Sequence, residues 1–169
     1  MLEVEGLTKS FGMGSNKLEV LKGIDMEMKT GELVALMGPS GCGKSTLLNI
    51  IGGLLPGDGG KITLKSRDYG LKGPSSVVDV RRDLVGWIFQ DFHLLNHLSA
   101  MDNVAMALEL SGIESKEAEI RAAEALNKVG LGDRMHHIPE QLSGGQQQRV
   151  AIARAIAGNR PLLPVSYTH

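Results

Sequence analysis

The chain has 169 residues, 42% of them hydrophobic and 22% charged, with a formal net charge of −1. This length accommodates one globular domain, and the near-neutral charge argues against bulk nucleic-acid binding. The single cysteine excludes an internal disulfide, and the sequence contains no apolar run of about 18 residues that could span a membrane. Glycine is overrepresented: its 22 residues are near twice the usual share of about 7%.

The N-terminal third has the patterns of strands and loops. Apolar residues at period two predict antiparallel strands around a loop at 12–16; they are Leu2, Val4, Ile24, Met26 and Met28. The continuous apolar run Leu33–Met37 predicts a strand buried on both faces, as in a parallel sheet. A glycine-rich loop and a helix from Lys44 to about Ile51 are expected next. The following loop, Gly52–Gly60, contains five glycines that the sequence explains only as flexibility.

The remainder of the chain changes from strand to helix patterns. A short strand is expected at 61–64, irregular structure over 65–76, and a buried strand at Val85–Phe89. Beyond residue 90 apolar residues repeat at helical spacing, which predicts helices at 100–111 and 117–129. A third helix should follow Ser143-Gly144-Gly145. This order of elements indicates an α/β fold with a helical insertion.

The loop before the first helix carries the clearest motif. Residues 38–45, Gly-Pro-Ser-Gly-Cys-Gly-Lys-Ser, match G-x-x-x-x-G-K-[ST] at every fixed position. Glycines let successive backbone N–H groups converge on phosphate oxygens, and the helix start adds partial positive charge. Lys44 would supply a point charge to the β- and γ-phosphates, and the Ser45 hydroxyl can ligate Mg²⁺. This motif predicts a nucleoside triphosphate site.

A second motif, Leu-Ser-Gly-Gly-Gln at 142–146, opens the third helix. Ser143 is a natural N-cap, and two glycines expose N–H groups at the helix start. By itself this pattern is more typical of an ordinary helix cap. Beside a phosphate-binding loop, a second anion site becomes the better interpretation.

Together these motifs resemble the ATP-binding cassette (ABC) family of transporter ATPases, over residues 1 to about 163. The resemblance is strongest to the branch of lipoprotein-release and macrolide-export systems, through stretches such as 44–50 and 89–95. It implies an α/β P-loop NTPase core with an N-terminal antiparallel β subdomain and a helical subdomain that carries the signature motif. On this reading residues 1–91 are the core and β subdomain, and 92–157 are the helical part.

The resemblance also implies site residues. Phe11 matches the aromatic that stacks on adenine, and Gln90 matches the glutamine that reaches Mg²⁺ and the attacking water. Lys44 and Gln90 are thus the expected catalytic residues, and Ser45 and Gln90 the expected metal ligands. Nucleotide contacts are expected from Phe11 and from the loop and helix start, namely Gly38, Pro39, Ser40, Gly41, Cys42, Gly43, Lys44, Ser45 and Thr46.

Family resemblance further implies how the subunit is assembled. Two copies would form a head-to-tail dimer with two ATP molecules between them. Ser143, Gly144, Gly145 and Gln146 would contact the nucleotide of the partner. Residues around 91–104 would face integral membrane permease subunits, which places the protein at the cytoplasmic face of the inner membrane. Nucleic acid is not an expected partner.

The family's later catalytic residues have no match in this sequence. An Asp-Glu pair and then a histidine are expected after the signature helix, but no carboxylate follows Glu140. Asp91 is an alternative metal ligand, although the order of motifs favours the glutamine role for its neighbour. We therefore expect a domain that is incomplete at its C-terminus and inactive in hydrolysis. Residues 164–169 match a translated sequencing adapter, which suggests a non-native tail.

Two alternative functions remain open at this stage. One is a non-transport ABC ATPase, which predicts basic stripes or coiled-coil insertions. The other is a remnant that binds nucleotide or a partner without hydrolysis.

Overall fold

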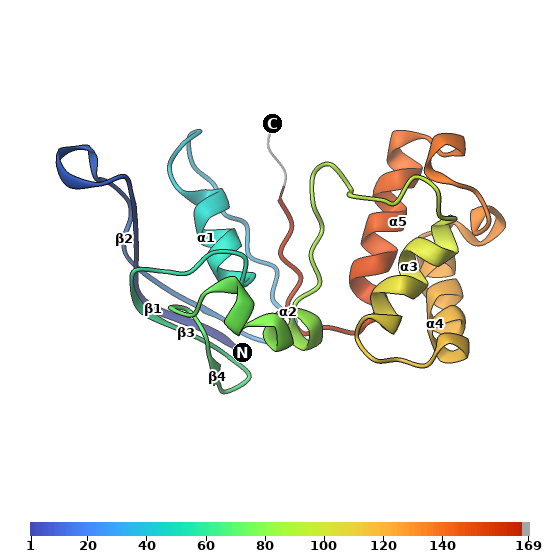
Figure 1. Cartoon of the computed structure of the whole chain (residues 1–169), viewed down its shortest axis with the longest axis horizontal. Helices are drawn as coiled ribbons and strands as arrows, with labels where there is room; N and C mark the ends of the chain where they lie inside the picture. The colour runs from blue at the N-terminus through green and yellow to red at the C-terminus, as the bar shows by residue number, and fades with distance from the viewer. Residues whose placement is uncertain (167–169) are drawn as a thin grey trace. The chain divides into compact units, whose positions relative to one another are not determined.

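The computed structural model describes residues 1–166 and divides the chain into two compact units, Met1–Leu84 and Val85–His169. Within the described residues, no helix is both long and apolar enough to cross a membrane. The first unit contains a sheet and two helices, and the second is mainly helical (Figure 1).

The first unit is built on a four-stranded antiparallel sheet in the order β2-β1-β3-β4. Its strands are β1 (Leu2–Phe11), β2 (Leu18–Met28), β3 (Gly59–Leu64) and β4 (Arg67–Asp68). Alternating residues of β1 enter the core, since Leu2 and Val4 are buried. The predicted antiparallel pairing of the first two strands is therefore confirmed.

Two helices, α1 (Lys44–Ile51) and α2 (Val78–Leu84), complete this unit. The structure confirms the predicted bounds of α1, whereas α2 lies in a segment for which we made no prediction. Tyr69 is buried, and its hydroxyl donates a 2.5 Å hydrogen bond to the Ile51 carbonyl at the end of α1. The core residues of the unit are Leu2, Val4, Leu7, Leu21, Leu47, Ile50, Ile51, Ile62, Leu64, Tyr69, Val77, Val80 and Leu84.

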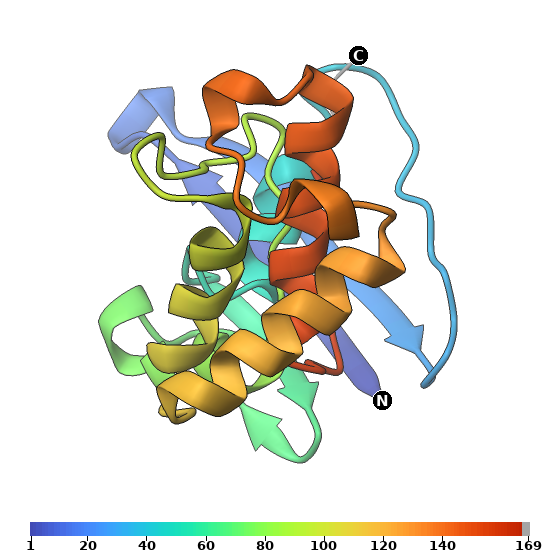
Figure 2. The same ribbon diagram turned by 90° about the vertical axis from the view of Figure 1, so that its right-hand side faces the viewer.

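The prediction of a buried strand at Leu33–Met37 is wrong. This segment is extended coil between β2 and α1, light blue in Figure 2, and Leu33 and Met37 are 99% and 89% exposed. A strand needs a neighbour for its backbone N–H and C=O groups, and among residues 1–166 no strand pairs with this segment. An apolar run indicates a preference for burial but supplies no such neighbour.

The second unit packs three helices around one apolar core. These are α3 (Ala100–Glu109), α4 (Ser115–Lys128) and α5 (Gly144–Ala157), and each contacts the other two (Figure 2). The bounds of α3 and α4 agree with the predicted helices to within two residues at each end, and α5 begins at the predicted Ser-Gly-Gly motif. The core includes Val104, Leu108, Ala118, Ala122, Leu126, Leu131 and Val150. Short 3-10 turns also lie at Gly14–Asn16, Pro74–Ser76, Gly132–Arg134 and Pro139–Gln141.

The segment Val85–Phe89 has buried residues, Val85 and Ile88, and half-buried ones, Trp87 and Phe89, but it is less regular than the strand that we expected. Val85 and Ile88 make isolated parallel bridges with Leu162 and Val165. The Pro164 carbonyl accepts a hydrogen bond from the Ile88 N–H at 3.1 Å. Proline takes part here through its carbonyl alone, since it has no N–H to donate. The remaining tail residues, 167–169, lie outside the described part of the chain.

Close backbone approach explains part of the glycine-rich loop that precedes and enters β3. A Cβ atom on Gly60 would lie 2.5 Å from the carbonyl oxygens of Glu5 and Gly6, and Gly60 also has a φ of +90°. A Cβ on Gly57 or Gly59 would lie 2.8 Å from a side-chain atom of Leu7 or Thr8, both on β1. These glycines therefore let the loop lie directly against the central strand.

We expect Gly60→Ala to lower the free energy of unfolding by about 2–4 kcal/mol, because the methyl group clashes with backbone and the left-handed φ is strained. Denaturant titration of both proteins measures the loss. Gly73→Ala is the matched control, since Gly73 has a φ of −64° and open space around its Cβ position. Equal stability of the Gly60→Ala and Gly73→Ala proteins would contradict the close-approach explanation.

Candidate nucleotide-binding site

The predicted phosphate-binding loop leads directly into α1. Gly43 is the N-cap of this helix and has a left-handed φ of +97°. A Cβ at this position would meet Val20 and Leu21 side-chain atoms at 3.0 Å. The first intrahelical bond runs from Leu47 N–H to the Gly43 carbonyl, so the N–H groups of residues 44–46 precede the helical ladder. Such N–H groups form an anion site at a helix start.

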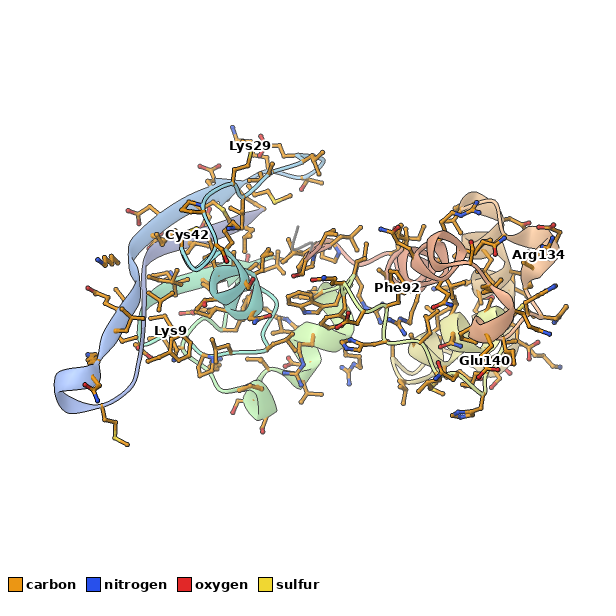
Figure 3. The ribbon with its side chains drawn as sticks, turned by 90° about the horizontal axis from the view of Figure 1, so that it is seen from above. Lys9, Lys29, Cys42, Phe92, Arg134 and Glu140 are labelled. Carbon is orange, nitrogen blue, oxygen red and sulfur yellow. The ribbon has the colours of Figure 1, made fainter. Side chains whose placement is uncertain are left out.

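Lys44 is held within this loop. Figure 3 labels Cys42, a residue of the same loop. Its ammonium donates to the carbonyls of Gly38 and Pro39 at 2.7 and 2.8 Å and lies 3.7 Å from the Cys42 sulfur. The loop thus curls around one cation, which leaves this positive charge beside the helix start. That arrangement fits the β- and γ-phosphates of a nucleotide.

A hollow lies between this loop and β2. It has a volume of about 400 Å³, and its lining includes Leu18, Val20, Gly41 and Cys42. Phe11 is paired directly with Leu18 across the β1–β2 ladder, and the residue is 43% exposed. The structure therefore brings the expected stacking residue to a strand position opposite a wall of the hollow, and the other wall is the phosphate-binding loop.

A metal ion at this site would be coordinated mostly by the phosphate oxygens of a bound nucleotide. Ser45 is exposed in the first turn of α1, so its hydroxyl is available to a cation that also binds phosphate. Among residues 1–166, no group of three His, Cys, Asp or Glu side chains could hold a metal. The Ser45 hydroxyl, together with phosphate oxygens, fits a Mg²⁺ ion that binds with a nucleotide.

The signature residues lie in the second unit, at the start of α5. The Ser143 hydroxyl accepts from Gln146 N–H at 3.3 Å, and the Gln146 side chain accepts from Ser143 N–H at 2.8 Å. These reciprocal bonds form a capping box. A Cβ on Gly144 or Gly145 would meet nothing within 4 Å. The fold itself therefore has room for a side chain at both glycines.

Gln90 also belongs to the second unit, whereas Phe11 and the phosphate-binding loop belong to the first. Gln90 is exposed and follows the segment Val85–Phe89. The next residues, Phe92 (labelled in Figure 3) and His93, have left-handed φ values of 58° and 46°. Two consecutive residues other than glycine in this region are strained, so other contacts must hold the loop.

Arg154 on α5 supplies those contacts, and the sequence reasoning missed it. Its guanidinium donates to the carbonyls of Phe92 and His93 at 2.5 and 2.7 Å, and burial lowers its pKa. The sequence around Arg154 does not indicate that its guanidinium binds the carbonyls of Phe92 and His93. Only the folded structure shows that this arginine fixes the loop beside Gln90.

Comparison with known proteins agrees with these features. The family model described as ABC transporter matches residues 21–164. The chain belongs to the ABC transporter family.

Relatives of known name align with nearly all of this chain. The lipoprotein-releasing system ATP-binding protein LolD 2 of Caulobacter vibrioides is 45% identical over 163 residues, which are 96% of this chain and 71% of LolD 2. The macrolide export ATP-binding/permease protein MacB of Wolinella succinogenes is 44% identical over 96% of this chain. The chain spans 26% of that longer protein.

A solved structure supports the fold directly. The ATP-binding cassette MJ0796, in a dimeric post-hydrolysis state bound to ADP and Pi, matches with a TM-score of 0.85 and 40% identity. The match covers 96% of this chain and 72% of that one. These comparisons confirm both the predicted α/β P-loop NTPase fold and the resemblance to lipoprotein-release and macrolide-export proteins.

The open space around Gly145 gives a prediction that separates folding from function. We expect Gly145→Ala to maintain the free energy of unfolding or to raise it by up to about 1 kcal/mol, because alanine is the better helix former. Chemical denaturation monitored by circular dichroism measures this change. Loss of stability would show that the fold, rather than a ligand or partner, requires the glycine.

Proposed function

We propose that this chain is the nucleotide-binding part of an ABC transporter that couples MgATP binding and hydrolysis to export of a substrate or extraction of a lipoprotein. The observation that carries this proposal is the placement of the Lys44 ammonium inside the loop at the start of α1. Phe11 lies across the strand pair from the hollow beside that loop. A site for phosphates and a site for a base thus occur together in one unit.

In this proposal the chain's own residues bind and orient the nucleotide. The N–H groups of residues 44–46 and the Lys44 ammonium bind phosphate oxygens, and the exposed Phe11 ring stacks on the base. Thr46 and the loop residues Ser40 and Gly41 contribute further backbone contacts. Ser45 and Gln90 would hold the Mg²⁺ ion, whose charge offsets that of the phosphates when it is bound.

Assembly with other chains is part of the same proposal. Ser143, Gly144, Gly145 and Gln146 would contact nucleotide on the partner subunit of a head-to-tail dimer. The open space around both glycines supports this role, since the fold does not require them. Residues around 91–104 would contact integral membrane permease subunits at the cytoplasmic face of the membrane. Relatives named for lipoprotein release and macrolide export support this assignment.

Removal of the Lys44 ammonium tests the phosphate site. We expect Lys44→Ala to weaken ATP binding at least tenfold, because no other lysine or arginine lies in residues 38–46. Isothermal titration calorimetry with MgATP measures the change. Lys61→Ala, which removes an exposed lysine of β3, is the control and should bind like wild type. Equal affinity of wild type and Lys44→Ala would contradict the proposed site.

Hydrolysis by the chain itself provides a separate test. We expect the 169-residue chain to bind ATP without steady release of phosphate, because no Asp or Glu follows Glu140 to hold the metal or position water. A phosphate-release assay with Lys44→Ala as background measures turnover. Sustained release by wild type that disappears in Lys44→Ala would show that other residues perform this chemistry.

A further inference from the structure

An ion pair between a buried lysine and an exposed carboxylate lies at the end of β1, outside the groups so far assigned a role. Lys9, labelled in Figure 3, is only 9% exposed. Its ammonium lies 2.7 Å from an Asp58 carboxylate oxygen. The hydrogen bonds from Lys9 and from the Ser10 N–H lower the pKa of Asp58 below its usual 3.8. The Asp58 carboxylate is therefore charged at neutral pH.

Asp58 also extends the hydrogen bonding of β1 beyond its strand partner. The pairing of β1 with β3 ends at Thr8 and Gly59, and the Asp58 N–H donates to the Thr8 carbonyl at 2.9 Å. The second carboxylate oxygen of Asp58 accepts from the Ser10 N–H at 2.7 Å. The side chain thus replaces the neighbour strand that β1 lacks at this point.

The glycines around Asp58 make this contact possible. Gly57, Gly59 and Gly60 lie so close to β1 that a Cβ on any of them would come within 2.8 Å of β1 atoms. A bulkier loop would hold the Asp58 backbone farther away, and its short side chain could not then reach Ser10. The glycines of this segment therefore allow the Asp58 side chain to reach β1, in addition to making the loop flexible.

The ion pair lies against the aromatic ring at the end of the same strand. The Lys9 ammonium lies over the Phe11 ring, 5.6 Å from its centroid, a cation–π arrangement. Phe11 is 43% exposed and is paired with Leu18, which lines the hollow. Asp58 therefore fixes both the backbone before Phe11 and the cation over its ring.

We propose that Asp58 is a positioning residue of the nucleotide site, which fixes the Phe11 ring through Lys9 and the Ser10 N–H as a preorganised platform for the base. This proposal rests on the proposed function, because it takes Phe11 as the stacking residue. A platform that is already fixed loses little freedom when a base binds. The effect of Asp58 should thus appear for nucleotides and be absent for ligands without a base.

Two ligands and a matched pair of variants test this role. ATP carries a base, whereas inorganic tripolyphosphate offers only the phosphates. Asp58→Ala removes the contact with Ser10. Asp25→Ala removes a similar contact on the same strand, since an Asp25 carboxylate oxygen accepts from the Gly6 N–H at 2.6 Å. Calorimetry with each ligand, and thermal unfolding of each variant, are measured on the full chain.

We expect Asp58→Ala to bind ATP about five- to tenfold more weakly than wild type, a part of the effect that base stacking on an aromatic ring produces. Its affinity for tripolyphosphate should equal that of wild type, and Asp25→Ala should bind both ligands normally. A parallel loss of ATP and tripolyphosphate binding in Asp58→Ala would overturn the proposal. Unchanged ATP binding would also overturn it.

Lys9→Met provides a second test if Asp58→Ala does not fold, because methionine keeps much of the apolar stem and removes the ammonium. It should weaken ATP binding in the same direction and leave tripolyphosphate binding unchanged. If the wild type binds tripolyphosphate as tightly as ATP, the base platform is absent although the phosphate site stands. If it binds neither ligand, the proposed function itself fails.

Discussion

The central place of β1 is the constraint on which the first unit depends. This strand is hydrogen-bonded to β2 on one side and to β3 on the other. Its buried residues contribute to the core, and its last residue, Phe11, is placed opposite the wall of the hollow. Because the pairing of β1 with β3 ends at Thr8, the final residues of β1 need another hydrogen-bond partner on that side of the strand. The position of Phe11 therefore depends on a strand and on the Asp58 carboxylate, rather than on a loop alone.

In the second unit, polar side chains fix irregular backbone against a core of small apolar residues. The buried Asn103 amide donates to the carbonyls of Leu95 and Leu98, and the Arg154 guanidinium donates to those of Phe92 and His93. Alanines such as Ala118 and Ala122 let the helices approach closely. The loop after Gln90 is consequently tied at two places to the helices that follow it.

Local patterns in the sequence predicted the parts of this structure that have local causes. The motif at 38–45 predicted a loop that leads into α1, because its glycines and lysine act on their own backbone, and helical spacing located α3, α4 and α5. The run Leu33–Met37 was misjudged, since a strand depends on a partner that its own residues do not encode. Similarly, the contacts of Asp58 with Lys9 and of Arg154 with His93 join residues 49 and 61 positions apart, and no spacing rule reveals them.

The extended segment at residues 33–37 immediately precedes the phosphate-binding loop. In the described part of the chain, this segment has no strand to hold it, so the loop is anchored on one side by α1 and on the other by coil. Fixing the coil when a ligand binds costs conformational entropy of roughly 1–2 kcal/mol per residue. Part of the favourable phosphate interaction would therefore be spent on ordering the chain. A strand that covered residues 33–37 would supply this order in advance and so raise nucleotide affinity without touching the nucleotide.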